Sequence, residues 1–107
     1  MELQAKACVP CRGGMDPIGR EQAERLVKDI PGWSLSADGI KLSRRYVFPD
    51  FAAAMRFANQ VGDIAEREGH HPDLTIGWGY CNVETYTHKI GGLHENDFIL
   101  AAKINQL

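Results

Sequence analysis

The most informative part of the chain is residues 50–88, which read DFAAAMRFANQVGDIAEREGHHPDLTIGWGYCNVETYTH. Its first half predicts a helix, because apolar residues recur at helical spacing from Phe51 to Ala65. Asp50 can cap the start of this helix, and Gly69 suits the left-handed conformation in which many helices end. Its second half predicts two strands, because apolar and polar side chains alternate on both sides of Gly79.

The flanking segments predict four further elements. A helix is expected from Arg20 to Ile30, where Pro31-Gly32 would stop it. Two strands are expected at residues 33–35 and 40–48, joined by a turn around Asp38-Gly39, and a final helix at residues 95–106.

The resulting order is α-β-β-α-β-β-α, which predicts an α+β fold. We expect a four-stranded antiparallel sheet covered on one face by three helices. Residues 1–19 show no periodic apolar pattern and are predicted to form an irregular N-terminal leader, with residues 20–107 as a single domain.

Composition excludes several classes of protein. The 107 residues are 44% hydrophobic and 24% charged, which is typical of one globular domain. A formal net charge of −2 argues against a nucleic-acid partner. The longest apolar runs are too short to span a bilayer, and no signal peptide is visible, so no membrane partner is expected. Because the three cysteines do not form a disulfide scaffold, we expect a cytoplasmic protein.

Three histidines are predicted to converge at the open end of the second hairpin. If Gly79-Tyr80 forms a two-residue turn, pairing along the hairpin brings His71 opposite His88. Side chains at opposite positions of an antiparallel pair lie close together. His70 precedes His71 directly. Imidazoles titrate near neutral pH, so one can accept a proton while another donates one.

Two carboxylates are candidates for orienting these imidazoles. Glu66 precedes His70 by four residues, so the end of the helix can bring the two together. Asp97 lies in the first turn of the last helix, where the helix dipole favours a negative charge. Each has a simpler interpretation: Asp97 as a helix cap only, and Glu66 as an ordinary surface residue.

A metal site is the main alternative for the histidine cluster. Adjacent His70 and His71 would point in opposite directions on a strand, which suits a chelate poorly. Cys8 and Cys11 could form a zinc knuckle or a redox pair, but a single Cys-x-x-Cys is a weak signal. We therefore predict no metal and no cofactor.

The arrangement of these residues resembles the signature of the pterin-4a-carbinolamine dehydratases. The matching positions are Glu66, His70, His71, Pro72, Trp78, His88 and Asp97. The likeness extends more loosely from Pro31 to the C-terminus, and the leader is similar to the longer N-termini of some microbial and plant members. Two positions depart from the family pattern, because Gly69 replaces a residue that is often acidic and His94 replaces a Ser or Thr cap.

The resemblance implies a hydro-lyase. Members of this family dehydrate 4a-hydroxytetrahydropterin (4a-hydroxytetrahydrobiopterin) to quinonoid dihydropterin, which recycles the pterin cofactor of aromatic amino acid hydroxylases. The family fold is a four-stranded antiparallel sheet with three helices. Members form homodimers or homotetramers and need no cofactor, since the pterin is the substrate.

The resemblance also assigns roles to residues. It implies that His70 and His88 form the acid–base pair, in an order that spacing does not settle, while His71 holds the pterin. Glu66 and Asp97 would orient imidazoles. Further residues implied to line the substrate pocket are Gly69, Tyr86, Thr87 and Lys89. His94 would add a fourth imidazole nearby, which we expect to be non-catalytic.

Two other functions remain open at this point. The chain could be a dehydratase-like protein of other pterin metabolism, for instance molybdopterin metabolism. Alternatively, it could act without catalysis as a dimerisation cofactor for a transcription factor, as some members of the family do. The complete set of histidines favours an enzyme.

Overall fold

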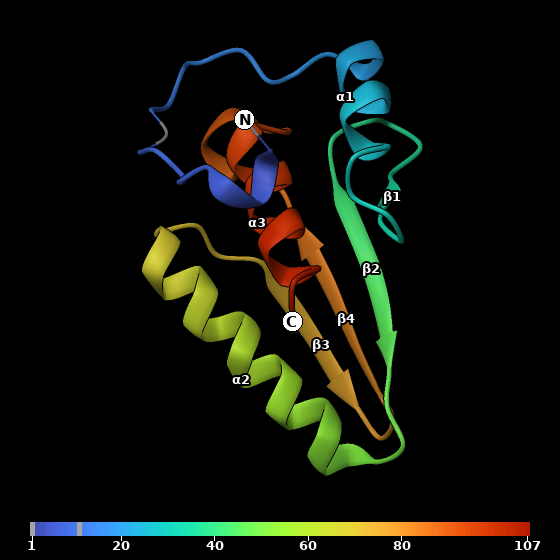
Figure 1. Cartoon of the computed structure of the whole chain (residues 1–107). Helices are drawn as coiled ribbons and strands as arrows, with labels where there is room; N and C mark the ends of the chain where they lie inside the picture. Colours follow the sequence, from blue (N-terminus) through green and yellow to red (C-terminus); the bar gives the residue numbers. More distant parts are fainter. Residues whose placement is uncertain (1, 11) are drawn as a thin grey trace.

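The structure is a computed structural model that describes residues 2–10 and 12–107. Three α-helices and four strands follow the predicted order and form an α+β fold, which confirms the expected fold class (Figure 1). The helices are α1 (Arg20–Val27), α2 (Phe51–Glu68) and α3 (Glu95–Ile104). The strands are β1 (Ser34–Leu35), β2 (Leu42–Val47), β3 (Asp73–Gly77) and β4 (Tyr80–Thr85). Two short 3-10 helices, η1 (Leu3–Ala5) and η2 (His88–Ile90), were not predicted.

Helix ends follow local chemistry. Helix α2 begins where the Asp50 side chain accepts a hydrogen bond from the Ala53 amide at 2.8 Å, and it ends at Gly69 with φ +67°. Both signals were predicted. Helix α1 ends at Val27 rather than Ile30, because residues 28–30 tighten into i→i+3 hydrogen bonds before Pro31. A residue preceding proline is disfavoured in the α conformation, which explains the early end.

The four strands form one antiparallel sheet in the order β1-β2-β4-β3. The predicted register of the β3–β4 hairpin was wrong. Gly77 pairs with Tyr80, so the loop is Trp78-Gly79 rather than Gly79-Tyr80. Gly79 has φ +80°, and glycine is the residue that adopts this value at the second loop position without strain. The register shifts by two residues, so side chains keep their predicted faces but His71 does not lie opposite His88.

The core lies between the sheet and the helices. The inward side chains of β4 are fully buried, including Cys81 and Val83, and they pack with Phe57 and Val61 of α2. Helix α3 is buried almost all round, because the N-terminal segment covers its outer side. One contact that holds this segment is the Lys103 Nζ donation to the Gln4 carbonyl at 3.0 Å. Figure 1 shows the blue η1 against α3, from where the chain swings outward and then runs to α1.

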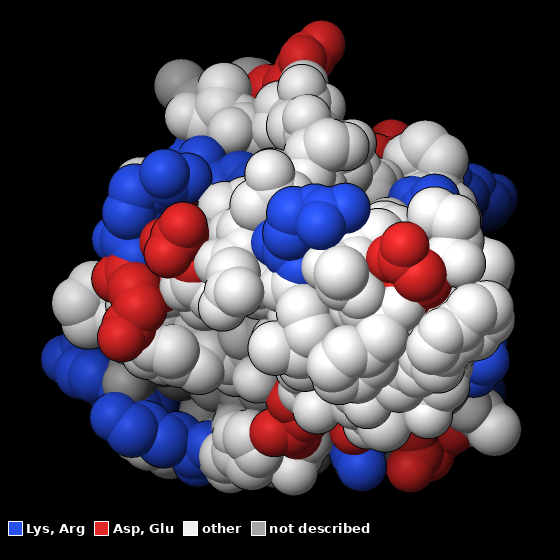
Figure 2. All heavy atoms as spheres, turned by 90° about the horizontal axis from the view of Figure 1, so that it is seen from below, with Lys and Arg blue, Asp and Glu red and all other residues white. Residues whose placement is uncertain are grey.

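Charges are mixed on the face seen in Figure 2, where acidic and basic side chains alternate around a broad area of other residues. No stripe of one sign runs across this face. Within residues 2–10 and 12–107, none of the helices combines the length and the apolar character that crossing a membrane requires.

Candidate functional site

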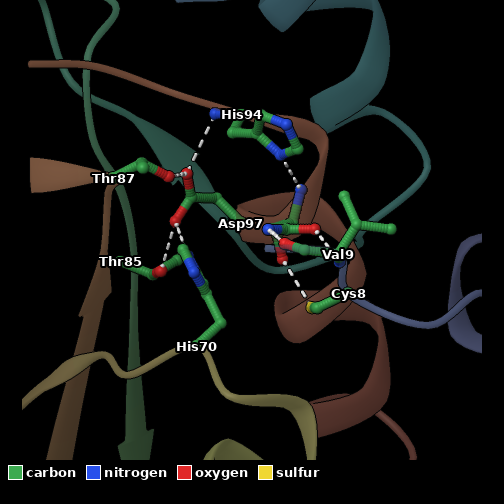
Figure 3. A network of polar contacts seen from close by, with 8 residues as sticks. Cys8, Val9, His70, Thr85, Thr87, His94 and Asp97 are labelled. Carbon is green, nitrogen blue, oxygen red and sulfur yellow. Dashed lines mark hydrogen bonds and ion pairs between the residues drawn. The ribbon is translucent and has the colours of Figure 1, made fainter. Parts of the chain in front are cut away.

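The centre of the site is the buried carboxylate of Asp97, in the first turn of α3 (Figure 3). Its Oδ1 accepts hydrogen bonds from the Thr85 hydroxyl and from His70 Nε2, each at 2.6 Å. Its Oδ2 accepts from the Thr87 hydroxyl at 2.7 Å and from the His94 amide at 3.0 Å. Four donors therefore surround a side chain with no exposed surface, as a buried charge requires.

Asp97 both caps α3 and contacts an imidazole, two roles that the sequence alone left as alternatives. Through His94 it forms part of a capping box, in which His94 Nδ1 accepts from the Asn96 amide at 3.0 Å. Through Oδ1 it holds His70, whose side chain is only 11% exposed. His94 thus substitutes for the usual Ser or Thr cap.

Glu66 does not orient His70, and this prediction was wrong. Its Oε2 lies 2.8 Å from His71 Nε2 instead, and the two side chains are 79% and 62% exposed. The end of α2 at Gly69 explains why Glu66 contacts His71 and not His70. The chain leaves the helix in a left-handed turn there, so the helical i, i+4 relationship no longer applies to His70.

His88 reaches the site from the 3-10 helix η2. Thr87 forms an isolated bridge with Gly92, and the chain turns through His88–Ile90 between them. The ring of His88 packs against that of Tyr86, with centroids 4.1 Å apart and planes tilted by 46°. His88 and Lys89 are both exposed to solvent.

His70, His71 and His88 line one open cavity of about 250 Å³, just below the usual range for ligand pockets, about 300–1,000 Å³. All the pocket residues implied by the family resemblance line this cavity. The lining consists of Val9, Gly69, His70, His71, Tyr86, Thr87, His88, Lys89 and Asn96. The three histidines therefore share a cavity, although the register that suggested it was wrong.

The leader takes part in the site, which the sequence did not indicate. Val9 lines the cavity, and its backbone is bound on both sides by the Asn96 side chain. Cys8 lies beside it, with its amide donating to Glu68 Oε1 at 2.9 Å. Burial, reinforced by the Glu68 carboxylate, raises the pKa of the Cys8 thiol to about 12. Such a thiol is a poor nucleophile and a poor metal ligand at neutral pH.

Of the suggested Cys8–Cys11 pair, Cys11 lies outside the described residues. Among the residues that are described, no group of three or more His, Cys, Asp and Glu side chains is arranged to hold a metal ion. Thr85 was also missed as a site residue. Thr85 could have been recognised as a polar side chain on the inward face of β4, where its neighbours are apolar and buried.

The fold and the site together define a class: a small α+β domain in which a buried carboxylate holds a histidine beside an open cavity. The family model described as pterin 4 alpha carbinolamine dehydratase matches residues 16–107. The chain belongs to this family.

Relatives and solved structures agree with that assignment. A protein of Methylococcus capsulatus is 54% identical over 98% of this chain and 92% of its own length. One of Halorhodospira halophila is 51% identical over 100% of this chain and 98% of its own. Both carry the provisional name pterin-4-alpha-carbinolamine dehydratase. A crystal structure described as a transcriptional coactivator/pterin dehydratase from Brucella melitensis aligns with a TM-score of 0.79 and 25% identity, covering 85% of this chain and 97% of that one.

Proposed function

We propose that this protein dehydrates 4a-hydroxytetrahydropterin to quinonoid dihydropterin by histidine acid–base catalysis. The observation that carries the proposal is the His70–Asp97 pair at 2.6 Å, at the wall of a cavity that His71 and His88 also line. In this reaction the C4a–O bond breaks, N5 loses its proton, and a C4a=N5 double bond forms. One group must accept the N5 proton and another must protonate the departing hydroxyl, which leaves as water.

His70 is the better candidate for the base. Its Nε2 is engaged by Asp97, so Nδ1 is the nitrogen through which it would exchange a proton with the substrate. The buried carboxylate stabilises the imidazolium that forms, as in other carboxylate–histidine pairs. His88 would protonate the leaving hydroxyl, and His71 would hold the pterin. Glu66 would act only through His71.

The test is an assay of the dehydration of 4a-hydroxytetrahydropterin with purified protein, compared with the spontaneous reaction. We expect a clear acceleration that survives dialysis against a strong chelator, because the proton transfers described need no Lewis acid. An unaccelerated reaction would overturn the proposal. Loss of activity on chelation, restored by a stoichiometric metal, would overturn the metal-free chemistry.

The physiological role we propose is recycling of the pterin cofactor of an aromatic amino acid hydroxylase in the cytoplasm. Coupling this protein to a phenylalanine hydroxylase should sustain hydroxylation at limiting pterin. A protein that binds a transcription factor but does not accelerate dehydration would instead match the coactivator role named for the Brucella melitensis structure.

A further inference from the structure

We propose that Val9 of the N-terminal leader is a substrate-contacting residue, held in place by Asn96, and that it sets the affinity of the cavity for the pterin ring. The inference rests on the proposed function. It concerns a segment outside the matched family region, which begins at residue 16. The Methylococcus and Halorhodospira relatives align over 98% and 100% of this chain, so their alignments extend into the leader.

The first argument is the anchoring of the Val9 backbone. The Val9 amide donates to Asn96 Oδ1 at 3.0 Å, and Asn96 Nδ2 donates to the Val9 carbonyl at 2.6 Å. Figure 3 shows Val9 and Cys8 beside the network that contains Asp97. Asn96 is 2% exposed and neighbours Asp97 in α3. The buried side-chain amide of Asn96 therefore forms hydrogen bonds with both the amide and the carbonyl of Val9.

Further contacts hold the same short segment. The Cys8 amide donates to Glu68 Oε1 at 2.9 Å, and the Cys8 thiol donates to the Asn96 carbonyl at 3.6 Å. Glu68 in turn lies 3.8 Å from Lys103 Nζ. Because α2 and α3 both contribute, Cys8 and Val9 are fixed relative to the cavity.

The second argument is the exposure of the Val9 side chain. Val9 as a whole residue is 56% exposed although its amide and its carbonyl are both hydrogen-bonded, and it lines the same cavity as the three histidines. A flat, partly apolar heterocycle entering the cavity would cover it and remove apolar surface from water. Since the backbone is already ordered, little conformational entropy is lost when this contact forms. Asn96 then acts as a positioning residue.

The experiment compares Val9→Ser with a matched control, Val47→Ser. Val47 is 77% exposed and pairs with Tyr80, at the end of β4 opposite the cavity. We expect Val9→Ser to raise KM, and the Kd of a stable dihydropterin analogue, by about 3- to 10-fold, since part of a valine burial is lost. Its kcat should stay within about twofold. Val47→Ser should change neither constant.

A second variant tests the anchor. Asn96→Asp loses the donor to the Val9 carbonyl, so it should raise KM at least as much as Val9→Ser and speed tryptic cleavage after Arg12. The dihydropterin analogue should slow that cleavage in the wild type. The double variant should be no worse than the worse single variant, because Asn96 acts through Val9. Thermal melting shows whether the Asn96→Asp variant is folded. If that variant is unfolded, Val9→Ser still tests the proposal, because Val9 is exposed and its replacement should not unfold the protein.

The outcomes separate the two proposals. If the wild type neither accelerates dehydration nor binds the dihydropterin, the proposed function fails and this inference fails with it. If the wild type does both but Val9→Ser leaves KM and Kd unchanged, only the role of Val9 is overturned. Equal effects of Val9→Ser and Val47→Ser would also overturn it.

Discussion

His70 Nε2 lies 2.6 Å from Asp97 Oδ1, although the two residues are 27 positions apart in the chain. The contact joins the segment that follows α2 to the first turn of α3, and Thr85 of β4 donates to the same oxygen. Three elements of the fold thus meet at one carboxylate. Their packing positions the imidazole before any substrate binds, which is the condition for efficient proton transfer.

Replacing either member of the proposed acid–base pair should lower kcat. Gln is the informative replacement at position 70, because its amide nitrogen can still donate to Asp97 but cannot exchange a proton. We expect His70→Gln and His88→Gln each to reduce kcat by about 10²–10⁴-fold in the dehydration assay. The double variant should be little worse than the worse single variant, because the pair acts as a unit.

The matched control for that experiment is His94→Ser. Serine is a preferred N-cap, and the backbone amide that donates to Asp97 remains. Its kcat should be normal, which would separate the catalytic imidazoles from the one that caps α3. A fall in kcat equal to that of His88→Gln would show that His94 takes part in the chemistry.

Asp97→Asn should reduce both the rate and the stability. An amide group has one donor end, which would face either the His70 imidazole or the His94 backbone amide. Leaving such a buried donor unsatisfied costs about 1–3 kcal/mol in the free energy of unfolding. Loss of the charge should also lower kcat by about 10²-fold or more. Denaturant unfolding and steady-state kinetics measure the two effects, and lower stability with normal kcat would reduce Asp97 to a cap.

The sequence was sufficient for the order of the α-helices and strands, because these depend on local patterns. Apolar periodicity predicted α2, and Gly69 predicted its end. The pairing of Glu66 was mispredicted, since it depends on how the chain leaves a helix at Gly69. The hairpin register was mispredicted because Gly79 suits either position of a two-residue loop, and the structure places it second, after Trp78.

The remaining part of the site is set by contacts between distant segments. Val9 and Asn96 are 87 positions apart, and neither belongs to a recognisable motif. Thr85 and Thr87 continue the inward face of β4. Their hydroxyls find an acceptor only because α3 packs Asp97 against them. Such relationships follow from tertiary packing, which a single sequence does not display.

Glu66→Gln should have little effect on turnover. The Glu66–His71 pair is largely exposed, and exposed ion pairs contribute about 0–1 kcal/mol, so kcat/KM should change less than about fivefold. His71→Ala, by contrast, should raise KM at least as clearly as it lowers kcat, because His71 itself lines the cavity. Steady-state kinetics on both variants test this. A loss of 10²-fold or more in Glu66→Gln would restore the carboxylate to the catalytic machinery.

Asn105→Ala should destabilise the fold without changing catalysis. Its Oδ1 accepts hydrogen bonds from Trp33 Nε1 at 2.9 Å, from Arg44 at 2.8 Å and from the Tyr46 hydroxyl at 3.0 Å. This side chain therefore joins the end of α3 to the β1–β2 side of the sheet. We expect a loss of about 1–3 kcal/mol in urea unfolding, with KM unchanged. Gln106→Ala, at an exposed neighbouring position, is the control and should be neutral.

The thiol of Cys8 should be inert in the folded protein. Folding raises its pKa from 9.0 to about 12, mainly through burial and then through Glu68, so the protonated form is favoured. The stabilisation from this group is therefore complete below about pH 9 and is lost as the pH rises towards 12. Urea unfolding at several pH values should show stability falling over this interval, and falling less in Cys8→Ala. At pH 8, iodoacetamide should label Cys8 only after denaturation, as mass spectrometry of the peptide can show; rapid labelling of the native protein would mean that the thiol is a reactive site.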